Sequence, residues 1–168
     1  LVAPDISMGG NFAYDYIGEF YQTTTVYGYI KKQSVQEDYK FWLALLNSRL
    51  CWWYMANTGT VLANGYFRYK PDYIYPFPIP KTVSKDMESA IITVVDYILM
   101  IKSLPSNITV DEYVSNDGVI RQFEGVIDAL IYELYFPNEF ANANISFINS
   151  VHKDFIKIET NNQKDAIS

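Results

Sequence analysis

The sequence predicts an α+β fold, in which a mixed strand-and-helix subdomain around one apolar helix is followed by a helical subdomain. Residues 1–32 contain short runs rich in Val, Thr and Tyr between glycine turns, and these residue types favour strands. A nearly all-apolar stretch with helical spacing follows at residues 39–55. From Ser84 onward, apolar residues recur every three or four positions, which is the pattern of amphipathic helices.

The strand region begins with residues 2–6, a short apolar run that ends at a Ser-Met-Gly-Gly turn. Residues 11–14 are a second short piece. The longest predicted strand covers residues 20–30, where Thr, Tyr and Val dominate. Lys31 and Lys32 close this region, either as solvated residues at a strand end or as phosphate contacts.

The predicted central helix begins in the polar residues 34–38 and runs to about Met55. Its apolar side chains keep a three- and four-residue spacing, and the opposite face is apolar too. A helix that is hydrophobic on all sides is buried or contacts several partners. Gly59 suits its C-terminal cap, and we interpret Arg49 as a basic residue that favours the C-terminal end of the helix dipole.

A turn is predicted at Asn64-Gly65, a pair that strongly favours hairpins. Residues 60–75 are therefore expected to form a turn with a strand on each side. Strand alternation along residues 65–70 divides the side chains between two faces, with Tyr66, Arg68 and Lys70 on one and Phe67 and Tyr69 on the other.

The boundary between the two subdomains is predicted by prolines. Residues 75–80 alternate Pro with apolar residues, and such a run is excluded from central strands and from helices. We therefore expect an extended exit there, with a strand-and-helix subdomain over residues 1–80 and a helical support subdomain over residues 81–168.

The helical half shows its own start and stop signals. Ser84 is a good N-cap, with acidic residues in the first turn, and Pro105 marks the end of that helix. Residues 108–114 are predicted to form a short extra helix. Asp117 is the expected cap of the next long helix, which Pro137 is expected to stop.

The last helix is predicted over residues 146–158, and the polar tail at residues 160–168 is expected to fray. Asp128 and Glu133 fall opposite the apolar stripe of their helix, so the pattern favours a solvated face for both.

Charge is distributed unevenly along the chain. The net charge is −6, which argues against a strongly basic nucleic-acid footprint. Residues 1–80 carry six basic and six acidic side chains, whereas residues 81–168 carry seven basic and thirteen acidic ones. Between Arg49 and Lys81 there are four basic residues and one acidic residue, Asp72. An anion-binding surface is therefore expected in the first half.

No catalytic or metal-binding constellation is predicted. The sequence has no Gly-rich phosphate loop, no HExxH and no Cys/His cluster. The one cysteine, Cys51, is expected to be a buried structural thiol, and His152 a surface imidazole. No apolar run reaches the length that crosses a membrane, and a reducing cytoplasm suits a chain with one thiol.

Five segments, in this order and spacing, resemble one family. They are 2–6 (VAPDI), 43–50 (LALLNSRL), 65–70 (GYFRYK), Tyr73 with 78–80 (PIP), and 127–135 (IDALIYELY). Together they resemble the TaqI-like C-terminal specificity domain, the target-recognition part of adenine-specific DNA methyltransferases and fused restriction–modification enzymes. The acidic balance departs from what DNA binding favours.

The resemblance implies a sequence-specific module for double-stranded DNA that is non-catalytic by itself. Because the chain starts at Leu1, we expect it to be the C-terminal piece of a larger enzyme. The missing N-terminal domain would be a methyltransferase, with or without endonuclease activity, and would bind S-adenosylmethionine and flip the adenine. No cofactor is expected in this piece.

The predicted DNA-binding residues are Arg68, Lys70, Asn64, Lys31, Lys32 and Tyr66. Arg can contact guanine bidentately and Asn can contact adenine, while Lys more often contacts phosphate. For Arg68 an internal role is an open alternative, either stacked on Tyr66 or paired with Asp72.

A second hypothesis is a protein-interaction module, whose aromatic surface docks on a catalytic domain or on a partner subunit. The acidic half suits this role better than it suits DNA binding. The two hypotheses can hold together, one for each half of the chain.

Overall fold

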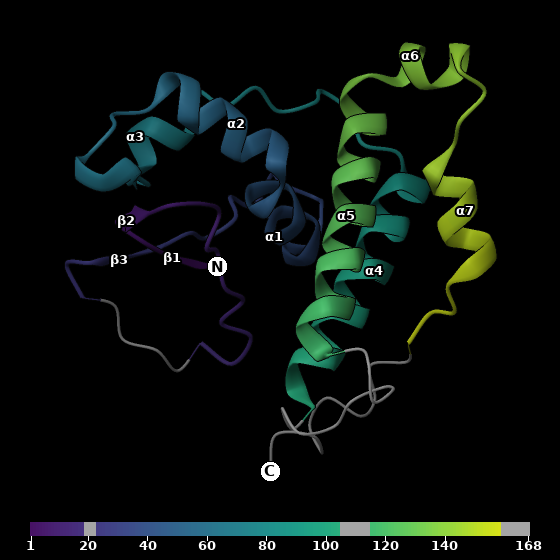
Figure 1. The fold of residues 1–168 in the computed structure, drawn as a ribbon, viewed down its shortest axis with the longest axis horizontal. Coiled ribbons are helices and arrows are strands. Elements are labelled where there is room, and N and C mark those ends of the chain that lie inside the picture. Colours follow the sequence, from purple (N-terminus) through teal and green to yellow (C-terminus); the bar gives the residue numbers. More distant parts are fainter. Residues whose placement is uncertain (19–22, 105–114, 159–168) are drawn as a thin grey trace. The chain divides into compact units, whose positions relative to one another are not determined.

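The computed structural model describes residues 1–18, 23–104 and 115–158, and confirms an α+β fold (Figure 1). The chain divides into two compact units, Leu1–Thr82 (unit 1) and Val83–Ser168 (unit 2). The predicted extra helix at residues 108–114 and the tail at 160–168 lie outside the described residues.

The strands that the structure describes in unit 1 form two short antiparallel pairs. β1 (Val2–Pro4) pairs with β3 (Val26–Gly28), and β2 (Ile6–Ser7) pairs with β4 (Phe67–Arg68). Asp5 joins the two pairs, because its N–H donates to the Thr25 carbonyl at 2.9 Å and its carbonyl accepts from the Tyr69 N–H at 2.7 Å. One continuous segment therefore ties the start of the chain to β4.

The strand predictions for residues 11–14 and 20–30 were too long. The first piece makes only an isolated bridge, Val2 to Ala13. In the second, the described strand is limited to β3, and Thr24 and Thr25 form a turn before it. Strand propensity depends on finding a partner backbone, and of the described residues 23–30 it is 26–28 that lie opposite β1.

The predicted single central helix is wrong, because the structure has two helices. α1 (Tyr39–Asn47) and α2 (Arg49–Thr58) meet at Ser48, whose backbone is extended (φ −64°, ψ 155°). The Ser48 hydroxyl donates to the Leu45 carbonyl at 2.7 Å and accepts from the Cys51 N–H at 3.2 Å. One side chain thus satisfies the end of one helix and the start of the next.

The break changes the expected burial of this stretch. Most of α1 is buried, with Phe41 and Leu45 fully covered, whereas Trp53 on α2 is 62% exposed. Arg49 is the first residue of α2, so its interpretation as a C-terminal helix charge is wrong. Gly59 is confirmed as the C-cap, where its N–H donates to the Met55 carbonyl.

Another helix, α3 (Pro71–Ile74), replaces the second strand expected within residues 60–75. Its proline stands at the first helical position, where a missing N–H costs nothing. Ile74 and Phe77 are buried. The chain then leaves unit 1 through residues 78–80, which have no regular structure.

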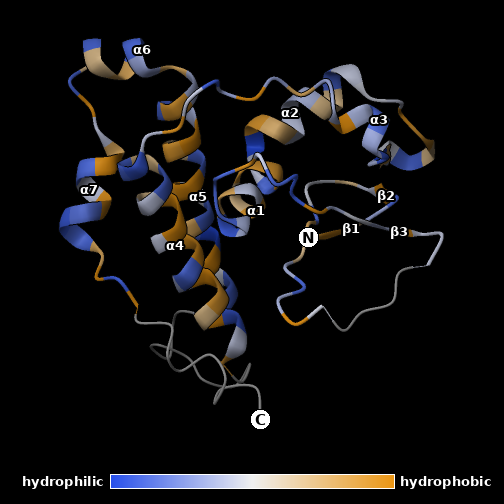
Figure 2. Ribbon diagram, turned by 180° about the vertical axis from the view of Figure 1, so that it is seen from behind, coloured by the Kyte–Doolittle hydropathy of each residue, from blue (hydrophilic) through white to orange (hydrophobic). Residues whose placement is uncertain are grey.

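The described residues of unit 2 form the helices α4 (Lys85–Ser103), α5 (Asn116–Tyr135), α6 (Pro137–Asn142) and α7 (Phe147–Asp154). α4 and α5 lie side by side, and α7 packs against both (Figure 1). Figure 2 shows hydrophobic residues repeating along α4 and α5, whose core includes the fully buried Ile91, Val94, Leu130 and Ile131.

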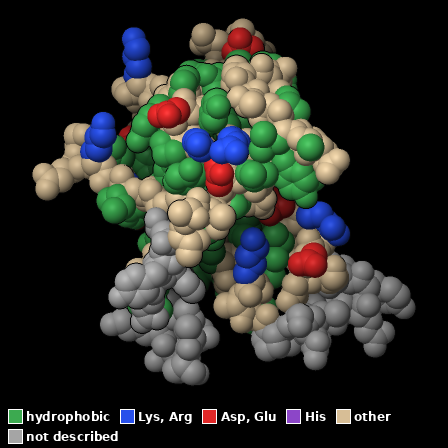
Figure 3. Space-filling view, turned by 90° about the vertical axis from the view of Figure 1, so that its left-hand side faces the viewer, with side chains coloured by type: hydrophobic (Ala, Val, Ile, Leu, Met, Phe, Trp, Pro, Cys, Tyr) green, Lys and Arg blue, Asp and Glu red, His purple; other side chains and the backbone are tan. Residues whose placement is uncertain are grey.

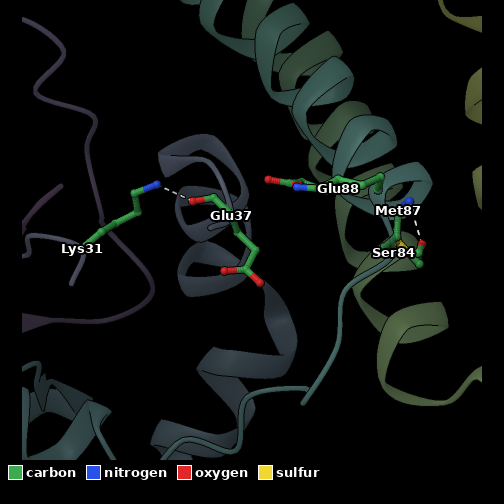
Figure 4. A network of polar contacts seen from close by, with 6 residues as sticks. Lys31, Glu37, Ser84, Met87 and Glu88 are labelled. Carbon is green, nitrogen blue, oxygen red and sulfur yellow. Dashed lines mark hydrogen bonds and ion pairs between the residues drawn. The ribbon is translucent and has the colours of Figure 1, made fainter. Parts of the chain in front are cut away.

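Capping explains the helix boundaries in unit 2. Ser84 is confirmed as the cap of α4, accepting from the Met87 N–H at 3.1 Å (Figure 4). The cap of α5 is Ser115, which accepts from the Gly118 N–H, and Asp117 lies inside the first turn, so that prediction is wrong. Pro137 follows the end of α5 as expected, but it begins α6, a helix that the sequence analysis did not predict.

Glu133 contradicts its predicted solvated position. Its side chain is buried, and its Oε2 accepts from the Phe147 N–H at 2.7 Å and from the Ile148 N–H at 3.2 Å. These are the first two N–H groups of α7, which also ends earlier than predicted. Periodicity on α5 alone gave no sign that another helix begins beside this carboxylate.

Among the described residues, no helix is both long enough and apolar enough to span a lipid bilayer.

Candidate nucleic-acid interface

The predicted turn at Asn64-Gly65 is confirmed. Residues 63–65 form a single 3₁₀ turn, and the chain reverses so that Val61 and Phe67 bridge each other. Asn64 (φ 63°) and Gly65 (φ 77°) both adopt the left-handed conformation, which Gly enters freely and Asn enters more easily than other residues. Both side-chain positions are exposed at the tip.

The side chains of the strand after this tip alternate between buried and more exposed positions, as predicted. Phe67 and Tyr69 are buried, whereas Tyr66 is exposed and Arg68 and Lys70 are half-buried. The ring of Phe67 meets Trp52 edge-on at 5.0 Å, and the ring of Tyr69 meets Phe12 at 6.0 Å. The buried rings anchor the strand, so that the polar side chains face outward from a rigid base.

Tyr29 holds the backbone of this strand in place at Tyr69. The Tyr29 hydroxyl donates to the Tyr69 carbonyl at 2.7 Å. Burial raises the pKa of both phenols far above the ordinary value. The two side chains therefore stay neutral over the working range of a protein and contribute no charge to the surface.

Arg68 has a partner that the sequence analysis missed. Its Nη1 lies 3.5 Å from Oδ2 of Asp5, and the exposed fractions of the two side chains are 36% and 17%. The partner expected within the domain was Asp72 or the ring of Tyr66. Sequence spacing gave no signal for Asp5, because the pairing of Ile6 with Arg68 in β2 and β4 brings it there.

Lys31 and Lys32 lie on a different segment, after β3. Lys31 Nζ donates to the Glu37 carbonyl (Figure 4) and lies 5.0 Å from the centre of the Tyr39 ring. Lys32 is exposed. The recorded contacts of Lys31 are with its own segment and not with Arg68 or Lys70, so its DNA contact stays a prediction.

Asn47, in the LALLNSRL segment, has a structural function. Its Oδ1 accepts from the Phe12 N–H at 2.9 Å, and its Nδ2 donates to the Phe12 carbonyl at 3.0 Å. The loop approaches α1 so closely that a Cβ on Gly10 would lie 2.7 Å from the Leu46 carbonyl oxygen. The amide of Asn47 is therefore committed to holding residues 10–12, which leaves base contacts to other residues.

Cys51 is a buried thiol, as predicted, with 1% of its surface exposed. Burial raises its pKa to about 12, so that the reactive thiolate is scarce. His152 is exposed, also as predicted. Among residues 1–18, 23–104 and 115–158, no group of three His, Cys, Asp or Glu side chains is arranged to hold a metal ion.

The surface over these elements is mixed in character. Figure 3 shows Lys and Arg side chains scattered among hydrophobic ones, with an acidic side chain beside some of them. Exposed apolar residues of unit 1 include Val61, Tyr66 and Tyr75. This arrangement suits a binding face that reads chemical groups at a few points better than one that attracts phosphates by bulk charge.

Comparison with known proteins identifies the first unit. Residues 1–79 match the family described as the TaqI-like C-terminal specificity domain. Comparisons with curated proteins and with solved structures find no match. The family is non-catalytic by itself, is part of methyltransferase-type proteins, and points to DNA recognition in restriction–modification systems. The resemblance seen in the sequence is thus confirmed over residues 1–79, which match the TaqI-like C-terminal specificity domain family, while residues 127–135 lie outside the match.

Proposed function

We propose that this chain is the part of a restriction–modification methyltransferase that recognises a specific sequence in double-stranded DNA. The observation that carries the proposal is the Asn64-Gly65 tip and the strand behind it. Tyr66, Arg68 and Lys70 face outward there, while Phe67 and Tyr69 anchor the backbone. The major groove of B-DNA presents a distinct pattern of donors and acceptors for each base pair, which outward-facing side chains can read.

The residue types at the tip match base recognition. An Asn amide pairs with the N6 and N7 edge of adenine, and an Arg guanidinium pairs with O6 and N7 of guanine. A Lys ammonium more often contacts phosphate and sets the register. We therefore assign base contacts to Asn64 and Arg68, and phosphate contacts to Lys70 and, from their own segment, Lys31 and Lys32.

Charge sets the expected strength of binding. Each neutralised phosphate adds affinity by releasing counterions, but residues 1–80 have no net positive charge and residues 81–168 are acidic. The catalytic part of the enzyme would then supply much of the phosphate contact. It would also bind S-adenosylmethionine and flip the target adenine, and the chain described here would choose the site.

A supporting role is proposed for unit 2. It carries the whole acidic excess, and its exposed apolar side chains include Phe136 and Ile145 at the two ends of the α6 region. Acidic surface repels DNA, whereas exposed apolar side chains suit contact with protein. This unit would dock on the catalytic part or on a partner subunit.

The test uses the full-length enzyme that carries this chain. A preferred duplex is first selected from a randomised pool by the wild-type enzyme, and mobility shifts then compare Arg68→Ala with wild type. We expect an affinity loss of about 10- to 100-fold on that duplex, with relaxed preference at one base pair. Arg121→Ala, which removes an exposed arginine from α5, is the matched control and should bind as wild type does.

Unchanged affinity together with unchanged sequence preference in Arg68→Ala would overturn the assignment of Arg68. The wider proposal is tested by exchanging residues 1–82 between two such enzymes of different specificity. If the exchanged segment does not carry its sequence preference with it, recognition lies elsewhere in the enzyme.

A further inference from the structure

Asp5 occupies a fixed position between the two strand pairs of unit 1. Its N–H and its carbonyl are both hydrogen-bonded, to Thr25 and Tyr69 respectively. The next residue, Ile6, lies opposite Arg68 in the β2–β4 pair. The backbone on both sides of the Asp5–Arg68 contact is therefore held by strand pairing, and the carboxylate has little freedom to move away.

The two oxygens of the Asp5 carboxylate differ in their contacts. Oδ2 lies 3.5 Å from Arg68 Nη1, which is long for a hydrogen bond. Oδ1 is buried and has no hydrogen-bond partner among the described residues. A buried acceptor without a donor is unfavourable, and a long, partly exposed ion pair contributes little to stability. Packing and stability therefore do not account for an aspartate at this position.

Arg68 also has hydrogen-bonding groups that its contact with Asp5 does not occupy. A guanidinium has five N–H donors in a planar fork, and within the part of the chain that the structure describes the Arg68 side chain has one polar contact, to Asp5. The side chain remains 36% exposed. One edge of the fork is thus restrained from within the protein, and the other donors are available to a ligand.

We infer that Asp5 is a positioning residue that holds Arg68 for base readout, an inference that rests on the proposed function. A restrained arginine loses less rotamer freedom when it binds, and it meets a base edge in one orientation. The carboxylate also offsets the positive charge, so that Arg68 gains less from a phosphate at a random site. Both effects raise discrimination between the preferred sequence and other DNA.

The test measures a ratio of affinities in the full-length enzyme. Mobility shifts determine Kd for the selected duplex and for a scrambled duplex of equal composition. Asp5→Asn keeps the shape of the side chain and both backbone hydrogen bonds but removes the charge. We expect the ratio of the two affinities to fall about tenfold, mainly because binding to scrambled DNA strengthens and becomes more salt-dependent.

Two further variants separate positioning from simple charge. Asp72→Asn removes one exposed acidic charge from α3 and should strengthen binding to both duplexes equally, leaving the ratio unchanged. Asp5→Glu keeps the charge but changes the reach by one methylene, so positioning predicts a lower ratio. Thermal denaturation of each variant confirms that it is folded, and Asp5→Glu serves as the test if Asp5→Asn is not.

A double-mutant cycle gives the decisive outcome. In the Arg68→Ala background, Asp5→Asn should no longer change the ratio, because Asp5 acts through Arg68. If Asp5→Asn behaves like Asp72→Asn while Arg68→Ala still loses discrimination, the positioning role is overturned and the proposed function stands. If Arg68→Ala itself binds both duplexes as wild type does, the assignment of Arg68 to base readout fails first.

Discussion

Asp5 in unit 1 and Glu133 in unit 2 are both largely covered carboxylates, but their oxygens are bound very differently. Oε2 of Glu133 accepts from two backbone N–H groups at the start of α7. With the Ser146 hydroxyl on the Asn149 N–H, it satisfies the first three donors of that helix. Over residues 1–18, 23–104 and 115–158, the Asp5 carboxylate has one long contact, to Arg68, and one oxygen without a donor.

Under the proposed function, the difference separates a group that completes the fold from a pair that is available to a ligand. In unit 2 the buried carboxylate of Glu133 accepts hydrogen bonds from backbone groups of the same unit, and most buried polar groups in proteins are likewise hydrogen-bonded. On the strand face of unit 1, Asp5 and Arg68 keep hydrogen-bonding capacity that the described residues do not use. Such unused capacity on a rigid strand is what a recognition surface needs.

Removing Glu133 should have the largest effect on stability. Glu133→Ala leaves the first two N–H groups of α7 without an acceptor, so we expect the unfolding free energy to fall by about 2 to 4 kcal/mol. Urea denaturation of the 168-residue chain measures it. Glu139→Ala, an exposed acidic residue in α6, is the control and should change the unfolding free energy by less than about 0.5 kcal/mol.

DNA discrimination by folded Glu133→Ala enzyme should match wild type. A lower affinity ratio in that variant would break the comparison, because it would give the second carboxylate a recognition role.

Asn47 extends the comparison into unit 1, where it is a polar group with a purely internal use. Asn47→Ala removes two hydrogen bonds to the Phe12 backbone, and we expect a loss of about 1 to 2 kcal/mol. Hydrogen exchange should show the Phe12 amide losing protection. Asn57→Ala, whose amide makes one exposed bond within α2, is the control. Unchanged protection of the Phe12 amide would contradict the role of Asn47 in holding residues 10–12.

The pH dependence of the unfolding free energy tests the burial of Cys51 in unit 1. The folded thiol has a pKa of about 12, against an ordinary value of 9.0. Because the folded pKa is raised, the unfolded chain loses its proton first, and stability falls as pH rises above 9. We expect the unfolding free energy to be about 1 kcal/mol lower at pH 10 than at pH 9, and this part of the decrease should be absent in Cys51→Ala. An equal decrease in both proteins would show that the thiol is not the cause.

Asn64 should have the smallest effect on the fold and a clear effect on binding. Asn64→Gly keeps access to the left-handed conformation, so the unfolding free energy should stay within about 0.5 kcal/mol of wild type. Asn64→Ala should lose about 1 kcal/mol. Both variants lack the amide, and both should bind the selected duplex about tenfold more weakly. If Asn64→Gly binds as wild type does, the amide does not read a base.

Several features of this protein could be predicted because their causes are local. The Asn64-Gly65 turn follows from the conformations that these two residues adopt at little cost. The Ser84 cap follows from a hydroxyl within reach of an N–H three residues later. The alternation of residues 66–70 follows from strand geometry. The break at Ser48 also had a local signal, since serine is a favoured N-cap, but uninterrupted apolar spacing outweighed it in the prediction.

The sequence by itself determined the α+β class, the family of residues 1–79, and the segment that faces outward. Only the tertiary structure decided that Arg68 meets Asp5, that Asn47 holds Phe12, and that Glu133 caps α7. The physical reason is the sequence separation over which each kind of interaction acts. Backbone preference acts over a few residues and leaves a readable pattern, whereas these contacts join segments from 14 to 63 positions apart. Their partners are set by strand register and helix packing, which no local pattern encodes.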